Sequence, residues 1–382
     1  MKNIYCVEDA RKLARRKLPR MIFDYVDGGA DNETTLRSNL AAFDNVNFVP
    51  RVLVNVANRI QDTTALDDHI NVPVLLAPVG LIRVVSREGE LAVARAAGKA
   101  GTVFIVSTAS SCSIEEIAAV ATGPLWFQLY LWRDRDFVRT LIKRAQTSGY
   151  TALCVAVDFP IAGKRLRDLH NGMTVPPRIG IRTAFEVLSK PSWLSGYLFG
   201  EKILLRNLLG IAKGNNMMSM WTYVNTELVD STVDWSDMAQ IRDIWKGPLL
   251  VKGIMTANDA INAIGCGVNG IIVSNHGGRQ LNGLPSTLEM LPEIIKAVEG
   301  HNIEVFVDGG VRHGTDVLKA IALGARACLI GRPYLWGLAS GGETGVIRIL
   351  EIFHEEIDRT LALIGRSKID EVDRSTVRIR NT

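Results

Sequence analysis

Several features that would assign this chain to other classes of protein are missing. Its 382 residues include only five cysteines and no CxxC pair, which argues against a structural zinc site and favours a reducing compartment. No uncharged apolar run reaches the roughly 18 residues of a membrane-spanning helix, and the N-terminus lacks the apolar segment of a secretory signal. We therefore expect a cytoplasmic protein with no metal site.

The chain also has no large excess of charge of either sign. The 44 basic and 40 acidic residues give a net charge of +4, and no Lys/Arg-rich tract carries interleaved aromatic residues, so no nucleic-acid partner is expected. The pattern G-x-G-x-x-G is absent after the first predicted strand, which counts against an open dinucleotide-binding sheet. A hydrophobic content of 47% is typical of a globular protein with an ample core.

From about residue 70 onward the chain alternates short apolar runs with longer amphipathic stretches. Eight such alternations predict an α/β fold, a closed parallel (β/α)8 TIM barrel, with residues 1–70 as an N-terminal helical extension. An open doubly wound sheet is the competing prediction. Strands are predicted at 72–77, 102–107, 125–130, 152–158, 249–252, 270–274, 304–308 and 327–331, and helices at positions that include 90–100, 136–147, 257–264 and 315–323.

Polar residues and glycines gather just past the predicted strand ends. In a TIM barrel the active site is built at this face from several strands, so these residues are expected to share one site. Singly, each also fits a structural role, such as Gln128 or Tyr130 at a strand end or Asp158 as a helix N-cap. The residues concerned are Pro78–Gly80, Ser107, Gln128, Tyr130, Asp158, Lys252, Ser274–Arg279, Asp308–Arg312, Gly331 and Arg332.

Residues 271–280, Ile-Ile-Val-Ser-Asn-His-Gly-Gly-Arg-Gln, are the most informative segment. A buried strand here ends at a histidine and an arginine among glycines, which let the backbone approach a ligand closely. His276 can accept a proton near neutral pH, and Arg279 can bind a carboxylate with two parallel hydrogen bonds. The alternative is a surface histidine beside a solvated arginine.

The last two predicted strands end in glycine-rich segments, Asp308-Gly309-Gly310-Val311-Arg312 and Gly331-Arg332. Loops at these positions of a TIM barrel commonly bind phosphate through backbone N–H groups. Arg312 and Arg332 would add charge-assisted contacts, so the two segments predict a phosphate site.

Residues 161–247, after the fourth strand, are too long for an ordinary connection and predict an insertion that acts as a lid or as a membrane or partner segment. Within it, residues 178–213 carry six basic and two acidic side chains interleaved with apolar and aromatic ones. This composition is typical of a segment that lies in a membrane interface. A helix that packs on the barrel or on another subunit is the alternative.

Four motifs give the chain a resemblance to the FMN-dependent α-hydroxy acid oxidase and dehydrogenase family, which includes glycolate oxidase, L-lactate dehydrogenase and mandelate dehydrogenase. The resemblance covers nearly the whole chain, from Leu18-Pro19 and Phe23-Asp24-Tyr25 onward. The most specific motif is Ser274-Asn275-His276-Gly277-Gly278-Arg279-Gln280-Leu281. The others are Val307-Asp308-Gly309-Gly310-Val311-Arg312, Phe127-Gln128-Leu129-Tyr130 and Ala77-Pro78-Val79-Gly80-Leu81.

The resemblance implies that FMN takes two electrons from an (S)-2-hydroxy acid to give the 2-oxo acid. It implies His276 as the base, Asp158 beside it, Arg165 and Arg279 at the substrate carboxylate, and Tyr25 and Tyr130 as phenols that bind the substrate. Lys252 would lie at the flavin N1–O2 edge, where a cation stabilises the reduced flavin. The implied FMN contacts are Pro78, Val79, Gly80, Ser107, Gln128, Lys252, Ser274, Asp308, Gly309, Gly310, Arg312, Gly331 and Arg332.

Three positions depart from the family pattern. Ala156 replaces the usual Thr two residues before the active-site Asp, and Asn282 replaces the usual Asp after Arg-Gln-Leu. Ala109 stands where glycolate oxidase has Trp, which would open the pocket to a larger substrate. Gly80 resembles the dehydrogenases that pass electrons to a quinone or a protein, whereas many oxidases have Ala there.

The sequence thus predicts a single FMN-dependent domain over residues 1–382 that oxidises L-lactate or a bulkier, mandelate-like acid. A tailoring oxidase of a larger biosynthetic 2-hydroxy acid is the first alternative, and an FMN-barrel isomerase is the second. The electron acceptor is expected to be a quinone, a protein or O2. A peripheral position on the inner face of the membrane through residues 178–213, and a tetramer by family resemblance, are further expectations.

Overall fold

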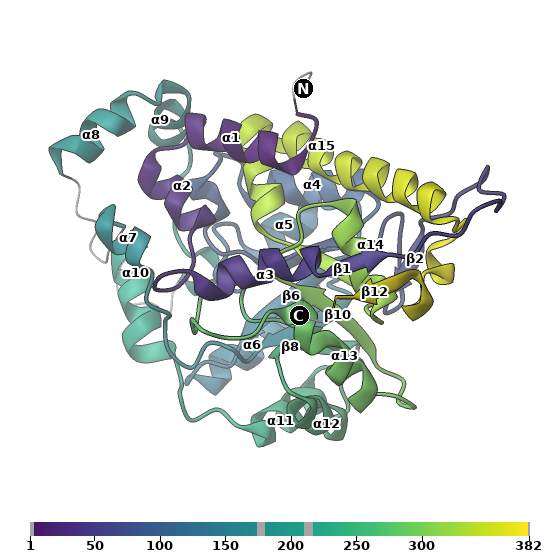
Figure 1. Cartoon of the computed structure of the whole chain (residues 1–382). Helices are drawn as coiled ribbons and strands as arrows, with labels where there is room; N and C mark the ends of the chain where they lie inside the picture. Colours follow the sequence, from purple (N-terminus) through teal and green to yellow (C-terminus); the bar gives the residue numbers. More distant parts are fainter. Residues whose placement is uncertain (1–3, 174–179, 210–216, 381–382) are drawn as a thin grey trace.

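The computed structural model describes residues 4–173, 180–209 and 217–380. Eight parallel strands close into a barrel in the order β10-β11-β4-β5-β6-β7-β8-β9, surrounded by helices (Figure 1). The predicted TIM barrel is therefore confirmed. The strands are β4 Val74–Leu76, β5 Phe104–Ser107, β6 Leu125–Tyr130, β7 Ala152–Ala156, β8 Leu249–Ile254, β9 Gly270–Val273, β10 Glu304–Asp308 and β11 Ala327–Ile330.

The strands are apolar on both faces because one face fills the barrel interior and the other packs under the helices. Trp126 and Phe306 meet edge to face inside the barrel, with ring centroids 5.7 Å apart. The Trp126 Nε1–H donates to Asp68 Oδ2 at 2.8 Å, which satisfies the only polar atom of that ring. The hairpin of β2 (Thr63–Ala65) and β3 (Asp68–Ile70) packs against this inner core.

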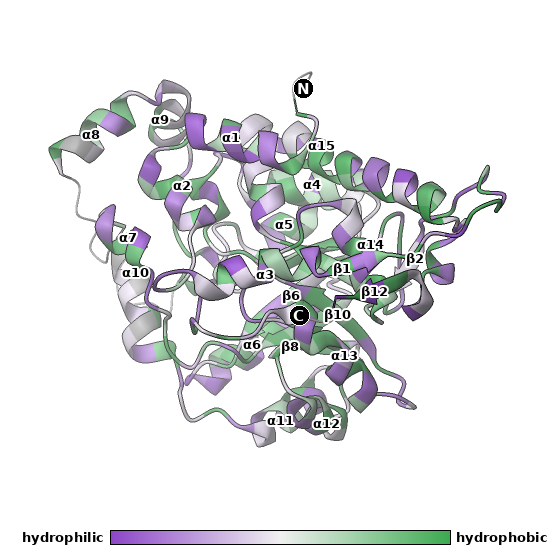
Figure 2. Cartoon of the chain, in the orientation of Figure 1, coloured by the Kyte–Doolittle hydropathy of each residue, from purple (hydrophilic) through white to green (hydrophobic). Residues whose placement is uncertain are grey.

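An outer ring of amphipathic helices covers the barrel, and Figure 2 shows them with hydrophilic and hydrophobic residues in alternation. Several begin at a side-chain cap, for example α6 at Asp134 and α13 at Ser286. These helices are α4 Glu90–Ala100, α5 Ile114–Val120, α6 Arg135–Thr147, α11 Trp235–Ile244, α12 Ala257–Gly265, α13 Thr287–Ala297, α14 Gly314–Ala322 and α15 Arg332–Ile364.

The N-terminal segment forms α1 (Val7–Lys17), α2 (Arg20–Asp27) and α3 (Thr34–Asp44). Helix α1 lies along α15, and the end of α2 reaches the face of the barrel where the strands end (Figure 1). Strand β1 (Val46–Phe48) pairs antiparallel with β12 (Val377–Ile379), which joins the two ends of the chain. Single turns of 3-10 helix occur at η1 Ile82–Val84, η2 Arg206–Leu208, η4 Ile369–Glu371 and η5 Arg374–Thr376.

Between β7 and β8 the chain leaves the barrel and returns through α11. The elements before α11 are α7 Leu166–His170, α8 Ile181–Leu188, α9 Pro191–Leu198, η2, α10 Met217–Tyr223 and the π-helical turn η3 Val224–Leu228. Arg178, Ile211 and Lys213 of the basic stretch lie outside the described residues. Within the described part of the chain, no helix is long and apolar enough to cross a membrane.

Candidate active site

A cavity opens where the barrel strands end, beside the C-terminal end of α2. Its walls include all of the predicted site residues except Asp158 and Ser274, which lie behind it. The predicted residues that line it are Tyr25, Pro78, Val79, Gly80, Ser107, Gln128, Tyr130, Arg165, Lys252, His276, Arg279, Asp308, Gly309, Gly310, Arg312, Gly331 and Arg332.

His276 faces this cavity from the loop after β9, and Asp158 supports it from behind. The His276 Nδ1 and Asp158 Oδ1 atoms are 3.0 Å apart, which leaves Nε2 as the ring nitrogen for a ligand. Burial acts to raise the pKa of Asp158, but the neighbouring His276 and Lys252 outweigh it and hold that pKa below its ordinary value. Asp158 is therefore an ionised hydrogen-bond partner of the His276 ring.

The backbone at His276 has a φ of +59°, a left-handed conformation that is uncommon for a non-glycine residue. The Ser274 hydroxyl accepts a hydrogen bond from the His276 N–H at 3.1 Å. The buried amides of Asn275 and Asn39 exchange two hydrogen bonds, at 2.8 and 2.9 Å, which tie the loop to α3. Nothing in the sequence indicated Asn39 as a partner of this loop.

Arg279 and Arg165 bring two guanidinium groups to the cavity. Arg279 Nη1 donates to the carbonyl oxygens of Tyr25 and Gly28, at 2.8 and 2.9 Å. Burial and the neighbouring Arg165 and Arg332 lower the pKa of Arg279 to about 9. An anion bound between Arg165 and Arg279 would relieve this repulsion, so the pair suits a carboxylate.

Lys252 is a buried cation at the floor of the cavity. Its Nζ lies 2.6 Å from Ser274 Oγ, 3.1 Å from Asp308 Oδ2 and 3.9 Å from Asp158 Oδ2. Burial acts to lower the pKa of Lys252, but the two carboxylates outweigh burial and raise that pKa above its ordinary value. Lys252 therefore remains charged in the cavity.

Two phenols complete the wall near His276. Burial and the Asp158 carboxylate raise the pKa of Tyr130 above its ordinary value, so its hydroxyl remains a hydrogen-bond donor. The Phe159 ring lies 5.3 Å from the Tyr130 ring and 6.3 Å from that of His276, measured between centroids. Tyr25 lies under Arg279, whose guanidinium carbon is 5.3 Å from the phenol ring centroid.

The rest of the cavity fits a flavin with a phosphate tail. Gln128 Nε2 and Asp308 Oδ1 are buried and have no hydrogen-bond partner among the described residues, so both are available to a polar heterocycle. The Ser107 hydroxyl holds Gln128 Oε1 at 3.1 Å, which orients that amide. At the other end of the cavity, burial lowers the pKa of Arg312 to about 10. Burial and the neighbouring Arg312 lower the pKa of Arg332 to about 9. A bound phosphate would neutralise this charge, so both shifts fit a phosphate site.

A model of the FMN-dependent dehydrogenase family matches residues 14–379. The chain belongs to that family. It is 42% identical to an L-lactate dehydrogenase of Caulobacter sp. (strain K31) over 371 residues, 96% of each chain. The structure of a monotopic membrane protein, (S)-mandelate dehydrogenase, has a TM-score of 0.95 at 37% identity and covers 99% of this chain and 100% of its own. A mandelate oxidase variant has a TM-score of 0.83 at 35% identity and covers 100% of both chains.

These matches confirm the predicted family, the FMN cofactor and the oxidoreductase class. The cavity residues that the sequence analysis did not single out include Trp132, Phe159 and Val224. Phe159 directly follows Asp158 and was detectable from that position, whereas Val224 belongs to the insertion and had no signal. Ala109 and Ala156 line the cavity, but Asn282 binds the α3 backbone instead, with its Oδ1 3.1 Å from the Thr35 N.

Proposed function

We propose that the chain oxidises an (S)-2-hydroxy acid to the 2-oxo acid. The observation that carries the proposal is that His276, with Asp158 hydrogen-bonded behind it, faces the same cavity as Arg165 and Arg279. A base beside two carboxylate-binding groups matches the two ends of a 2-hydroxy acid. The relatives named L-lactate dehydrogenase and (S)-mandelate dehydrogenase support the same reaction class.

In this proposal Arg165 and Arg279 hold the carboxylate, and Tyr25 and Tyr130 bind it and the C2 hydroxyl. His276 Nε2 takes a proton from the substrate, and Asp158 stabilises the imidazolium. Bound FMN supplies the acceptor for the two electrons, and the positive charge of Lys252 favours their uptake. Substrate loses two electrons and two protons in total. The same base fits two mechanisms. It could remove the hydroxyl proton while the C2 hydrogen leaves as a hydride, or it could remove the C2 hydrogen as a proton.

The proposal also assigns the residues that bind the phosphate and the ring of FMN. Arg312, Arg332 and the backbone of Gly309, Gly310 and Gly331 bind the phosphate. The ring contacts are Pro78, Val79, Gly80, Ser107, Gln128 and Lys252, while Ser274 positions Lys252.

For the substrate we favour L-lactate or a bulkier, mandelate-like acid, since the small residues Gly80 and Ala109 line the same cavity as His276. A second cavity of about 430 Å3 adjoins the first and shares Tyr130, Trp132, Ala156 and Phe159 with it. Its further walls are mainly apolar, which supports the second candidate, a larger 2-hydroxy acid whose tail extends past Phe159. Lactate, mandelate and this larger acid differ only in the group attached to C2.

For the acceptor we favour a quinone or a protein at the membrane surface. Gly80 supports a dehydrogenase, and α8 exposes Ile181, Phe185 and Leu188 on one face while basic residues flank it. The structural relative described as a monotopic membrane protein supports a peripheral position.

Anaerobic bleaching of the FMN-loaded protein tests the proposal. L-lactate and (S)-mandelate are compared, and air is then admitted. Rapid bleaching by either acid, with slow return of colour in air, is the expected result. Absence of bleaching by both acids and by longer 2-hydroxy acids would contradict the proposal and favour the FMN-barrel isomerase.

A further inference from the structure

Two of the groups proposed to bind the substrate come from distant parts of the chain. Tyr25 lies on α2, and Arg165 is the residue before α7, 140 positions later. Their separation in space therefore depends on how α7 is fastened to α2. The importance of this separation for substrate binding rests on the proposed function, whereas the contacts between the two helices do not.

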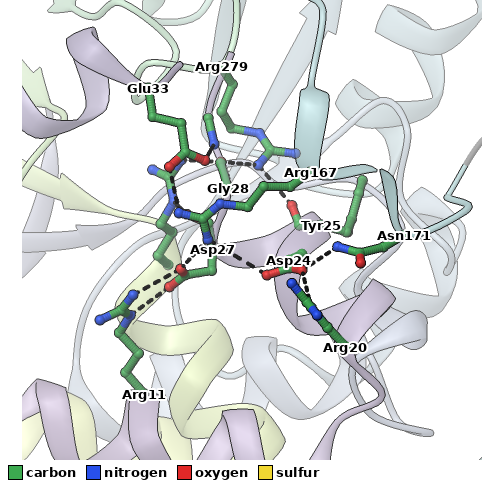
Figure 3. Close-up of polar contacts among 12 residues, drawn as sticks. Arg11, Arg20, Asp24, Tyr25, Asp27, Gly28, Glu33, Arg167, Asn171 and Arg279 are labelled. Carbon is green, nitrogen blue, oxygen red and sulfur yellow. Dashed lines mark hydrogen bonds and ion pairs between the residues drawn. The ribbon is translucent and has the colours of Figure 1, made fainter. Parts of the chain in front are cut away.

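Arg167, two residues beyond Arg165, connects α7 to α2 and to the start of α3 (Figure 3). Its Nη1 lies 2.9 Å from Asp27 Oδ2, and its Nη2 lies 2.5 Å from Glu33 Oε2. A third carboxylate, Asp24 Oδ1, is 3.7 Å from Nη1. One guanidinium fork thus binds carboxylates on both sides of the turn that follows Tyr25, a geometry that lysine cannot reproduce.

The carboxylates that receive Arg167 are themselves fixed. Asp27 is buried and accepts two further hydrogen bonds from Arg11, at 2.6 and 3.0 Å. Glu33 Oε1 accepts the Gly29 N–H at 2.9 Å. Because these partners are held by other groups, ordering Arg167 against them transfers their rigidity to α7.

Arg165, in contrast, has few contacts of its own. Its Nε is buried without a hydrogen-bond partner among the described residues, and its nearest carboxylate, Asp168 Oδ2, is 3.9 Å away on the same helix. Arg279 differs, because it is hydrogen-bonded to the backbone of Tyr25 and Gly28. Arg279 is thus tied directly to α2, while Arg165 is positioned through its backbone, by α7 and by the Asp31 N–H, which donates to the Lys164 carbonyl oxygen at 2.8 Å.

We propose that Arg167 is a positioning residue that, through Asp27 and Glu33, clamps α7 to α2 and so sets the distance of Arg165 from Tyr25 and Arg279. The clamp does not touch the substrate. It determines whether the two guanidinium groups can bind one carboxylate together. A misplacement of about 1 Å can cost a factor of 100 in catalysis, so loss of the clamp should weaken substrate binding markedly.

Arg11 provides a matched control. It donates to the same Asp27 carboxylate, but from α1, which does not carry a substrate-binding residue. If the contacts of Arg11 and Arg167 with Asp27 only stabilise the fold, Arg167→Met and Arg11→Met should have similar effects on ligand binding. If Arg167 is the clamp, only its loss should move Arg165.

The test uses the FMN-loaded protein and measures the Kd of the 2-oxo acid product, pyruvate or phenylglyoxylate, from the change in flavin absorbance. We expect Arg167→Met to raise Kd about tenfold or more, and Arg11→Met to leave it within about twofold. Glu33→Gln, which retains an acceptor for the Gly29 N–H, should raise Kd severalfold and serves if Arg167→Met does not fold. Equal effects of the Arg167 and Arg11 variants would overturn the proposal.

Hydrogen exchange separates failure of the clamp from failure of the proposed function. Residues 161–173 should exchange faster in Arg167→Met than in Arg11→Met, whether or not any 2-oxo acid binds. Equal exchange in the two variants would also overturn the clamp. If the wild-type flavin responds to no 2-oxo or 2-hydroxy acid, the proposed function fails, while the exchange result still decides on the clamp.

Discussion

The residues around His276 combine charges of both signs, and they range from partly buried, as His276 and Arg279 are, to buried, as Lys252 is. Each is held by a partner on another strand or loop: Asp158 for His276, Asp308 for Lys252, and backbone carbonyls for Arg279. Buried charges persist only with such partners. Arg165, Arg279, Arg312 and Arg332 leave an excess of positive charge in the cavity wall, which is consistent with the proposed anionic groups at its two ends.

The small residue at position 109 makes a prediction about substrate size. Ala109→Trp should fill the space beside Gly80 and raise KM for (S)-mandelate at least about tenfold more than KM for L-lactate, because one aromatic ring excludes another from a close-packed site. Steady-state kinetics with both acids checks this. Ala109→Ser, which adds little volume, is the control. An equal rise of both KM values would show that position 109 does not limit substrate size.

At the scale of single residues, the sequence predicted cavity residues correctly where charged residues or glycines directly follow a predicted strand. The segment 274–279 and both glycine-rich ends were found in this way, because a buried strand that stops at charged residues needs a ligand to explain it. Asn39 was not found, since it contributes through a contact 236 positions away that leaves no local pattern. Trp132 looked like an ordinary apolar residue of a core, whereas the place of Phe159 directly after Asp158 was a usable signal.

Helices were predicted well where one apolar face alone decides the pattern. The predicted helices 90–100, 136–147, 257–264 and 315–323 agree within one residue with α4, α6, α12 and α14. The chain between β7 and β8 was less predictable, because its helices α8 and α9 expose apolar side chains that the usual rule places inside. The length of residues 161–247 and the composition of residues 178–213 indicated a special role, but not the structure of the segment.

Helix α8 supports a test of membrane binding. Ile181, Phe185 and Leu188 are 80%, 69% and 65% exposed and occur at i, i+4 and i+7, which places them on one face. Replacing all three with Ser should reduce sedimentation with anionic phospholipid vesicles at least about tenfold and leave flavin bleaching unchanged. Leu363→Ser, at a position that is 70% exposed on α15, is the control. Undiminished sedimentation would exclude α8 as the contact.

The end of α2 supports a test of pH dependence. Burial acts to raise the pKa of Asp27, but the hydrogen bonds from Arg11 and Arg167 outweigh it and lower that pKa below its ordinary value of 3.8. The ionised carboxylate therefore adds stability that is present above about pH 4 and is lost as the pH falls through the lowered pKa. Asp27→Asn should reduce the free energy of unfolding by about 3 kcal/mol at pH 7 and by clearly less at pH 3.

Urea denaturation at both pH values measures this difference. Asp136→Asn, whose side chain is 92% exposed on α6, should cost little at either pH. A loss for Asp27→Asn that is the same at pH 3 and pH 7 would show that the Asp27 charge is not what stabilises the end of α2.

As a whole, the molecule is a barrel whose open face is completed by two segments from outside it, the N-terminal helices and the chain after β7. Tyr25 comes from the first, and Arg165 and Val224 come from the second. The tetramer implied by family resemblance remains a prediction, and light scattering on the FMN-loaded protein would test it.

FMN should stabilise the whole fold because it binds only the folded barrel. At 100 times its Kd a ligand adds about 2.7 kcal/mol to the free energy of unfolding. We expect FMN to raise the melting temperature of the flavin-free protein more than an equal concentration of riboflavin, which lacks the phosphate. Arg312→Met should abolish most of that difference. Equal shifts from the two flavins in the wild type would contradict a phosphate site at Arg312 and Arg332.

The most direct test of the account is the rate of anaerobic flavin bleaching by the better 2-hydroxy acid in His276→Asn, compared with the wild type. We predict a rate about a thousandfold lower, with FMN still bound and the Kd of the 2-oxo acid little changed, because the base is lost while Arg165 and Arg279 remain. A rate within tenfold of the wild type would show that His276 is not the base.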